Sequence, residues 1–343
     1  MIDYFQWLPD AWSCEHLYFY CTLQRLLYAA DPALWAELQA GVSSIERIES
    51  HHGSGTYDIS WAAVEGRTGS AIIVAGTTAL VQGLHQGALM LNLSYAPYPG
   101  LVAVYDAAVE EEINDRVMGR ILFGLRPPIT TCGHSLGGSV AQLLAHRIQL
   151  QFPGKLYGCL TFGSKKVGDQ AFCDGTTFPL YQVANSRDPV PKLCPPDTIF
   201  VPVPKLPRRS WPPEMTRLLN YRYAGTYFVL DIAGDMWVER NYVHVGIGHP
   251  MQRSIETPAS FDELLAHSST EYARRLRRRL YDLTSPSGLR AMQFRPTLDR
   301  INLELNRREG IVWIWDPETG LPLESLIEPW LPAAVCGCRS NQF

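Results

Sequence analysis

The sequence predicts an α/β protein with a mostly parallel central sheet and helices on both faces. Several short runs rich in apolar and β-branched residues are typical of buried strands: 70–76, 129–132, 155–164 and 179–185. Between them lie longer segments with apolar residues at helical spacing, at 105–123 and 139–152. Strands that alternate with helices over short loops favour a parallel sheet that is covered on both sides.

The first 50 residues are expected to be helical. EHLYFYCTLQRLLYAA is apolar on nearly every turn, and DPALWAEL begins with the cap residue Asp31 and with Pro32 at the first helical position, before Gly41 ends it. TYDISWAAVEG and SAIIVAG are separated by the turn signal RTG and are expected to pair as neighbouring strands.

Beyond the strand at 179–185 the character of the chain changes. The proline-rich stretch 192–222 predicts a surface excursion, because proline is excluded from helix interiors and central strands. A hairpin is expected over 223–246 and a helix over 268–283. We therefore expect one domain over 1–285 and a C-terminal extension over 286–343, with a second hairpin in GIVWIWDPETGLPLESL.

Composition and charge bear on three properties of the protein: nucleic-acid binding, cellular location and the state of its cysteines. The 343 residues carry a net charge of -4, with 46% hydrophobic and 19% charged residues, which gives no general attraction to nucleic acid. No uncharged stretch is apolar enough to predict a transmembrane helix, and the N-terminus has no secretory-signal pattern, so we expect a cytoplasmic protein, with signal-independent export left open. The eight cysteines form no CxxC pair and are expected to be free thiols.

The stretch ITTCGHSLGGSVAQLLAHRI carries the strongest functional signal. GHSLG fits the GxSxG pattern, in which Ser135 occupies a strained turn between a strand and a helix. Gly133 and Gly137 are expected to approach each other closely in that turn, and Gly138 to let the helix pack near the strand. The first backbone N–H groups of the helix would face an oxyanion beside the serine.

A nucleophilic serine requires a histidine base and a carboxylate that orients it. Asp188 lies just beyond a predicted strand and is the preferred carboxylate. His134 adjoins the serine but is expected to pack or to hydrogen bond locally. The residues leave three candidates for the base: His244, His249, and His267, which directly precedes a capping box formed by Ser268 and Glu271.

These motifs resemble those of the class 3 lipases, fungal-type α/β hydrolases that act on acyl esters. The matching pieces are AIIVAGT, TTCGHSLGGSVAQLLA, LTFGSKKVGD with VANSRDPVPKL, and AHSSTEY, across about residues 57 to 276. The resemblance implies an α/β-hydrolase fold with Ser135 as nucleophile, Asp188 as orienting acid and His267 as base. It also implies that the backbone N–H groups of Thr77 and Leu136 form the oxyanion hole, with no metal or cofactor.

Two departures concern the surroundings of that site. Ala75 replaces the usual arginine before the oxyanion residue, and residues 78–103 lack the family's lid motif, so a mobile flap and a buried core stay open as alternatives. A noncatalytic HxG element is implied at Tyr223 or at His244. The expected function is hydrolysis of acylglycerols or related lipid esters, with transient contact with a lipid interface; the alternatives are a phospholipase or other esterase and a non-catalytic scaffold.

Overall fold

The structure is a computed structural model of the whole chain. It describes residues 5, 14–51, 60–76, 116–168, 170–186, 188, 190–192, 225–230, 236–238, 266–281, 296–309, 314–315 and 322–323.

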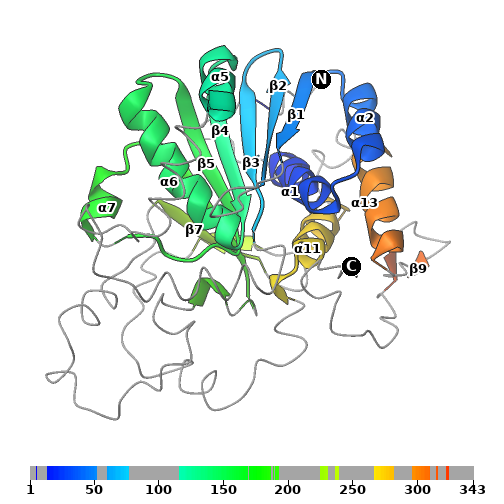
Figure 1. Cartoon of the computed structure of the whole chain (residues 1–343). Helices are drawn as coiled ribbons and strands as arrows, with labels where there is room; N and C mark the ends of the chain where they lie inside the picture. The colour runs from blue at the N-terminus through cyan, green and yellow to red at the C-terminus, as the bar shows by residue number, and fades with distance from the viewer. Residues whose placement is uncertain are drawn as a thin grey trace, which may run out of the picture.

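An eight-stranded sheet forms the centre of the molecule, with the strands side by side in chain order (Figure 1). Strands β3 to β7 are parallel to one another, whereas β1, β2 and β8 pair antiparallel at the two edges. The strands are β1 (Ile45–His51), β2 (Trp61–Gly66), β3 (Ser70–Val74), β4 (Ile129–His134), β5 (Leu156–Phe162), β6 (Leu180–Asn185), β7 (Thr226–Leu230) and β8 (Met236–Val238). This architecture confirms the predicted α/β-hydrolase fold.

Helices cover both faces of this sheet and create two apolar cores. Successive side chains of a strand point to opposite faces, so Ala71 and Ile73 enter one core while Ile72 and Val74 enter the other. Helices α1 (Cys14–Ala29), α2 (Pro32–Gly41), α11 (Ser269–Tyr281) and α13 (Pro296–Arg308) cover the first face, and α5 (Arg116–Gly124), α6 (Leu136–Gln151) and α7 (Gln170–Gly175) cover the second. Strands β2 to β6 are largely buried on both sides, as is typical of the inner strands of a sheet covered by helices.

The N-terminal prediction is confirmed for the two helices and wrong for residues 45–51. Asp31 caps α2 by accepting a 2.7 Å hydrogen bond from the backbone N–H of Ala33. Residues 45–51 are not helical: they form β1, which pairs antiparallel with β2. The strand has charged side chains on its exposed positions, as is common at a sheet edge, and this weakens the apolar alternation by which a strand is recognised.

Other predicted elements have mixed outcomes. The antiparallel pairs β2–β3 and β7–β8 and the helix over 268–283 are confirmed, and a short pair, β9 (Ile314–Trp315) with β10 (Pro322–Leu323), matches the second hairpin. The proline-rich stretch lies outside the described residues except at its first residue. No described helix is long and apolar enough to cross a membrane. Among the described residues, five cysteines are free thiols: Cys14, Cys21, Cys132, Cys159 and Cys173.

Helix α13 was not expected. Its residues Leu298, Ile301 and Leu305 are buried in the same core as α1 and α11, although they lie beyond the domain boundary drawn at residue 285. That boundary stays a prediction. The described part of the tail nevertheless packs on the sheet domain through α13.

Candidate active site

The loop between β4 and α6 holds Ser135 in a strained conformation. Its φ of 57° and ψ of -127° are rarely adopted by a residue with a side chain, and such strain is tolerated where the surroundings require it. The corner around Ser135 is closely packed: a Cβ at Gly133 would lie 2.1 Å from the carbonyl oxygen of Gly137, so only a glycine fits at position 133. Ser135 therefore stands at a sharp corner on the first turn of α6.

The expected close approach of Gly133 and Gly137 is confirmed, and the other two glycines of the corner also border the neighbouring strands. A Cβ at Gly137 would lie 2.3 Å from the carbonyl oxygen of Val74, at the end of β3. A Cβ at Gly138 would lie 2.6 Å from the Cβ of Ser164, just after β5. Both glycines thus let the start of α6 sit close to the neighbouring strands, which places Ser135 above the carboxyl ends of the sheet.

His267 and Asp188 meet Ser135 at this end of the sheet. Nε2 of His267 lies 2.8 Å from Oγ of Ser135, and Nδ1 lies 3.0 and 2.9 Å from Oδ1 and Oδ2 of Asp188. Because a carboxylate can only accept, Nδ1 carries the proton and Nε2 accepts from the serine hydroxyl. Such an arrangement can draw the proton from the serine as its oxygen attacks an electrophile.

Asp188 is fully buried and its carboxylate is held by several donors. Oδ2 accepts a 2.6 Å hydrogen bond from the hydroxyl of Tyr272, and Oδ1 accepts a 2.8 Å bond from the backbone N–H of Val190. The same tyrosine oxygen accepts from the backbone N–H of Asn185, at the end of β6. Burial of an ionised carboxylate requires such partners, so Tyr272 and the turn after β6 support its charged form.

Gly163 gives this carboxylate room. It follows β5 with a φ of +58°, and a Cβ there would lie 2.7 Å from Oδ2 of Asp188, 3.0 Å from the hydroxyl of Tyr272 and 3.2 Å from Cε1 of His267. Glycine tolerates both the backbone conformation and the close approach. This position therefore contributes to the site through the absence of a side chain.

His134 connects three parts of the site without contacting the serine hydroxyl. Its Nε2 lies 2.7 Å from the backbone carbonyl of His267, an acceptor, so Nε2 donates and Nδ1 accepts from the hydroxyl of Tyr28 at 3.0 Å. Tyr28 in turn accepts from the backbone N–H of Gly76, and the imidazoles of His134 and His267 stack with their centroids 4.9 Å apart. Burial, with a smaller effect of neighbouring His267, lowers the pKa of His134 to about 3. His134 is therefore a neutral residue that hydrogen bonds locally, as the sequence suggested.

The structure thus brings together Ser135, Asp188 and His267, and places the backbone of Leu136 at the start of α6, directly after the corner. Thr77 lies outside the described residues, as do Tyr223, His244, His249 and the segment 78–103. The roles of Tyr28 and Gly163 were missed. One of three tyrosines in a largely apolar helix, and a glycine after a strand, give no signal of what they will contact.

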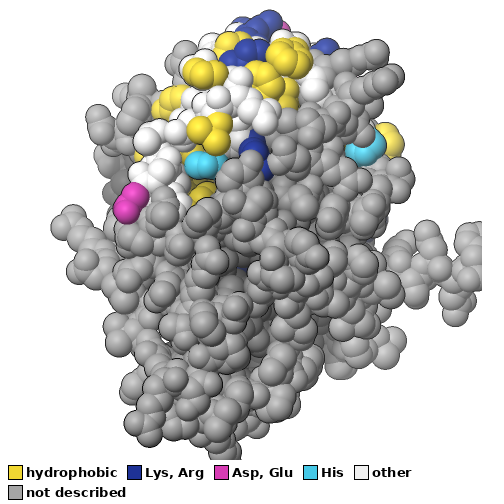
Figure 2. Space-filling view, turned by 60° about the vertical axis from the view of Figure 1, so that its left-hand side comes forward, with side chains coloured by type: hydrophobic (Ala, Val, Ile, Leu, Met, Phe, Trp, Pro, Cys, Tyr) yellow, Lys and Arg dark blue, Asp and Glu magenta, His cyan; other side chains and the backbone are white. Residues whose placement is uncertain are grey.

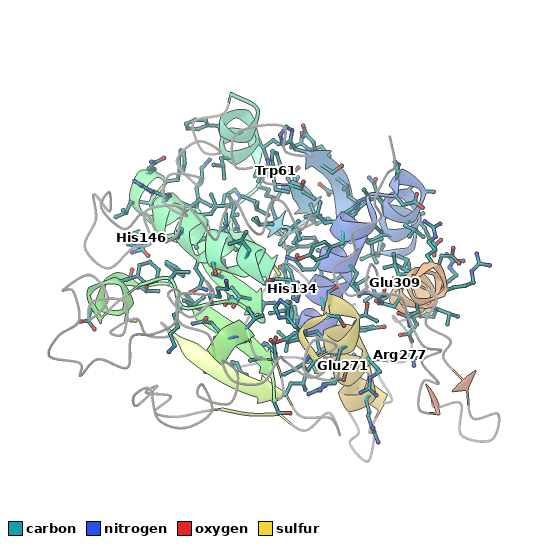
Figure 3. All side chains as sticks on the ribbon, turned by 60° about the horizontal axis from the view of Figure 1, so that its bottom comes forward. Trp61, His134, His146, Glu271, Arg277 and Glu309 are labelled. Carbon is teal, nitrogen blue, oxygen red and sulfur yellow. The ribbon has the colours of Figure 1, made fainter. Side chains whose placement is uncertain are left out.

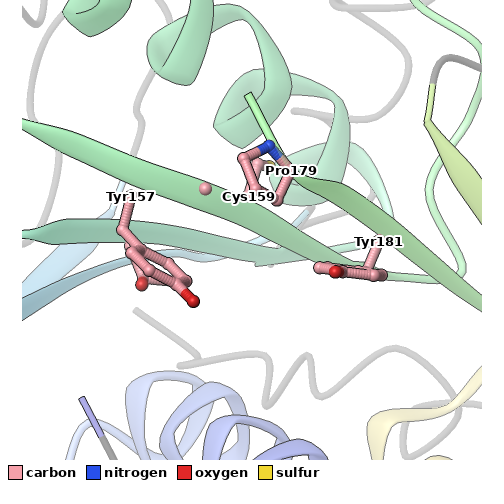
Figure 4. Close-up of a pocket in the computed structure, with 6 residues that line it drawn as sticks. Tyr157, Cys159, Pro179 and Tyr181 are labelled. Atoms are coloured by element: carbon pink, nitrogen blue, oxygen red, sulfur yellow. The ribbon is translucent and has the colours of Figure 1, made fainter. Parts of the chain in front are cut away.

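A small hollow on the sheet does not belong to this constellation (Figure 4). It lies against the amino-terminal halves of β4, β5 and β6, whereas Ser135 and Asp188 follow the carboxyl ends of β4 and β6. Its lining consists of Thr130, Tyr157, Gly158, Cys159, Pro179 and Tyr181. We therefore assign the candidate active site from the serine, histidine and aspartate alone.

A family model described as "Lipase (class 3)" matches residues 89–198. The match confirms the resemblance to class 3 lipases over this segment, which includes Ser135 and Asp188. A search of curated proteins finds no match for the chain.

Several solved fungal lipase structures are similar to the chain. A fungal lipase–inhibitor complex is 20% identical, with a TM-score of 0.49 over 66% of this chain and 83% of that chain. A triacylglycerol lipase described by its serine protease triad is 19% identical, with a TM-score of 0.48 over 74% and 92%. The native Rhizomucor miehei lipase–propeptide complex is 20% identical, with a TM-score of 0.46 over 66% and 72%.

Proposed function

We propose that this chain, a lipase-type carboxylic ester hydrolase of the class 3 lipase family by its match over residues 89–198, acts through Ser135, His267 and Asp188 on acylglycerols or related lipid esters. The observation that carries the assignment of residues is the continuous hydrogen-bonded chain from the serine hydroxyl through the imidazole to the buried carboxylate. No other described histidine lies within hydrogen-bond distance of the Ser135 hydroxyl.

In the proposed reaction, Ser135 Oγ attacks the ester carbonyl while Nε2 of His267 takes its proton. The imidazolium that forms is stabilised by Asp188, whose carboxylate stays ionised. His267 then gives the proton to the leaving alcohol, which separates and leaves an acyl group on Ser135. A water molecule that loses a proton to His267 attacks the acyl carbonyl and releases the carboxylic acid.

The oxyanion hole is assigned to the backbone N–H groups of Leu136 and Thr77. Leu136 supports this because it is the first residue of α6, where the helix dipole favours negative charge. The Thr77 assignment rests on the family resemblance together with its neighbour Gly76, whose backbone N–H is held by Tyr28.

We also propose transient contact with a lipid interface, because water-insoluble esters reach an enzyme as aggregates. The most exposed large apolar side chains among the described residues are Phe123 in α5 and Leu150 in α6. Figure 2 shows hydrophobic and basic side chains side by side at the top of the molecule, and Lys155 lies over the ring of Phe123. Leu150 lies roughly 22 Å along α6 from Ser135, at 1.5 Å per residue, so that patch is remote from the serine. The interface contact is therefore expected to involve another surface.

The test of the function is hydrolysis of p-nitrophenyl butyrate and palmitate, emulsified triolein and a phospholipid by wild type, Ser135→Ala, His267→Ala and His244→Ala. We expect the first two variants to lose turnover and His244→Ala to keep most of it. The relative rates of hydrolysis of these substrates distinguish an acylglycerol lipase from a phospholipase or a general esterase. A sharp rise in rate at the concentration where a soluble ester begins to aggregate is the expected sign of interface contact.

A folded wild-type protein that cleaves none of these esters and resists a fluorophosphonate probe would favour the scaffold alternative. The cytoplasmic location expected from the sequence stays a proposal, and localisation of a tagged full chain tests it.

A further inference from the structure

The C-terminal helix α13 is connected to the helix that carries the candidate base. α11 begins two residues after His267, and α13 lies beside it and packs against α1 in the same apolar core (Figure 3). Arg277 of α11 pairs with Asp299 of α13 at 2.9 Å. Buried Leu298, Ile301 and Leu305 provide the apolar part of this contact. The polar part reaches the first turn of α11, the turn that follows His267.

A buried arginine organises the polar contact. The side chain of Arg25, on α1, is fully buried, and its guanidinium donates to Oδ1 of Asn302 at 2.7 Å and to Oδ1 of Asn306 at 2.8 Å. It also donates to Oε1 of Glu309 at 3.1 Å. Since a buried cation needs a carboxylate partner and further acceptors, these contacts hold the end of α13 in one position.

Glu309 extends the connection to the base. Its second oxygen, Oε2, accepts a 2.5 Å hydrogen bond from Oγ1 of Thr270, which is three residues after His267. The carboxylate also lies at the amino end of α11, where the helix dipole favours negative charge. One residue of the tail thus bridges the buried Arg25 and the turn that follows the candidate base.

The other contacts of this turn come from the body of the domain. The Cys21 thiol donates to the carbonyl of Ser269, the side-chain amide of Asn185 donates to the carbonyl of Ala266, and His134 donates to the carbonyl of His267. Of the contacts described here, only that of Glu309 originates beyond residue 285. Removing it would leave the first turn of α11 without its bond on that side.

We propose that Glu309 and Thr270 are positioning residues for His267, so that helix α13 is part of the hydrolytic machinery. The inference rests on the proposed function only for its catalytic consequence. We expect a catalytic consequence because a displacement of a base by about 1 Å can reduce a rate by two orders of magnitude. The loss of a single hydrogen bond is expected to cost about tenfold in kcat.

The test compares Thr270→Val, which removes the hydroxyl and keeps the shape, with Thr270→Ser, which keeps the hydroxyl. Arg300→Gln is the matched control, because Arg300 joins α13 to Glu37 of α2 and not to α11. Each full-length variant is measured for kcat and KM on p-nitrophenyl butyrate, for the rate of fluorophosphonate labelling, and for hydrogen–deuterium exchange of the backbone amides of residues 266–272.

We expect Thr270→Val to lower kcat and the labelling rate about tenfold with KM changed less than twofold, and to speed exchange in residues 266–272 severalfold. Thr270→Ser should stay within twofold of wild type, as should Arg300→Gln. In a Glu309→Leu background, Thr270→Val should have little further effect, since both substitutions remove the same bond.

The inference is overturned if Thr270→Val keeps kcat and exchange within twofold of wild type, even when its melting temperature falls. A wild type that neither hydrolyses esters nor reacts with the probe would instead contradict the proposed function. In that case the exchange experiment still decides whether Glu309 and Thr270 order the turn, and unchanged exchange overturns the inference by itself.

Discussion

Tyr272 and His267 bind the same oxygen of Asp188: the tyrosine hydroxyl donates to Oδ2 at 2.6 Å and Nδ1 of the imidazole lies 2.9 Å from it. Tyr272 stands one turn into α11, on the same helix that begins after His267. Helix α11 therefore follows directly on the candidate base, His267, and also supplies a hydrogen-bond donor to its carboxylate partner, Asp188.

Tyr272→Phe should weaken both the fold and the rate. The substitution leaves the buried carboxylate of Asp188 and the backbone N–H of Asn185 each without one partner, and an unsatisfied buried group costs about 1–3 kcal/mol. We expect a lower free energy of unfolding in urea and a kcat lowered about tenfold, because Asp188 becomes free to shift relative to His267. Full activity together with wild-type stability would show that the tyrosine hydroxyl does not support Asp188.

Asp188→Asn should reduce kcat by about 10³ to 10⁴ with little change in the fold. The amide has nearly the shape of the carboxylate, but it can donate to Nδ1 of His267 and so favour the tautomer that cannot accept the serine proton. Steady-state kinetics on p-nitrophenyl butyrate measures the loss, and circular dichroism shows whether the variant is folded. A loss of less than tenfold in a folded variant would assign the orienting role to another group.

Gly163→Ala should abolish most activity, because the added Cβ would press against Asp188 and His267. Gly154 offers a matched control, because it also has a positive φ, of +81°, but a Cβ there would meet nothing within 4 Å. Both substitutions should cost about 1–2 kcal/mol of stability from backbone strain. Only Gly163→Ala should lower kcat, by roughly 100-fold, because it moves Asp188 or His267. Equal kinetic effects of the two variants would contradict this account.

The neutral state of His134 predicts a dependence of stability on acidity. Burial lowers its pKa in the folded chain to about 3, whereas in the unfolded chain the pKa is near 6.5. Between these values the unfolded state binds more protons, so this group removes stability as the pH falls through that window, at up to about 1.4 kcal/mol per pH unit. In His134→Gln this contribution disappears.

Urea unfolding of wild type and His134→Gln between pH 4 and 7 measures that difference. The free energy of unfolding of wild type should fall more steeply toward pH 4 than that of the variant, although the variant is less stable at pH 7 because it loses hydrogen bonds to Tyr28 and to His267. Parallel profiles would mean that His134 is not held neutral.

Much of this architecture could be predicted because its signals are local. The strands β3 to β6 are short runs rich in apolar and β-branched residues, and the corner at Ser135 requires glycines at positions that a motif can specify. Asp188 could be chosen from its place after a strand, whereas ranking His267 above His244 and His249 required the family resemblance, since a capping box alone does not reveal what a histidine faces.

The features that could not be predicted depend on distant contacts. β1 is recognisable as a strand only through its pairing with β2, because its charged exposed face resembles that of a surface helix. The hydrogen bond from Tyr28 to His134 joins residues 106 positions apart, and that from Thr270 to Glu309 depends on how α13 docks. Helix α13 itself has apolar residues at helical spacing after Pro296, so its existence could have been inferred from its pattern, but its role could not.

The most direct test of the central claim is covalent labelling by a fluorophosphonate probe, followed by identification of the modified peptide. Ser139→Ala is the matched control for Ser135→Ala, since Ser139 is a buried serine one turn further along α6. We expect a single adduct on Ser135, lost in Ser135→Ala, kept in Ser139→Ala and formed much more slowly in His267→Ala. Labelling that persists in Ser135→Ala, or a folded wild type that does not react, would contradict it.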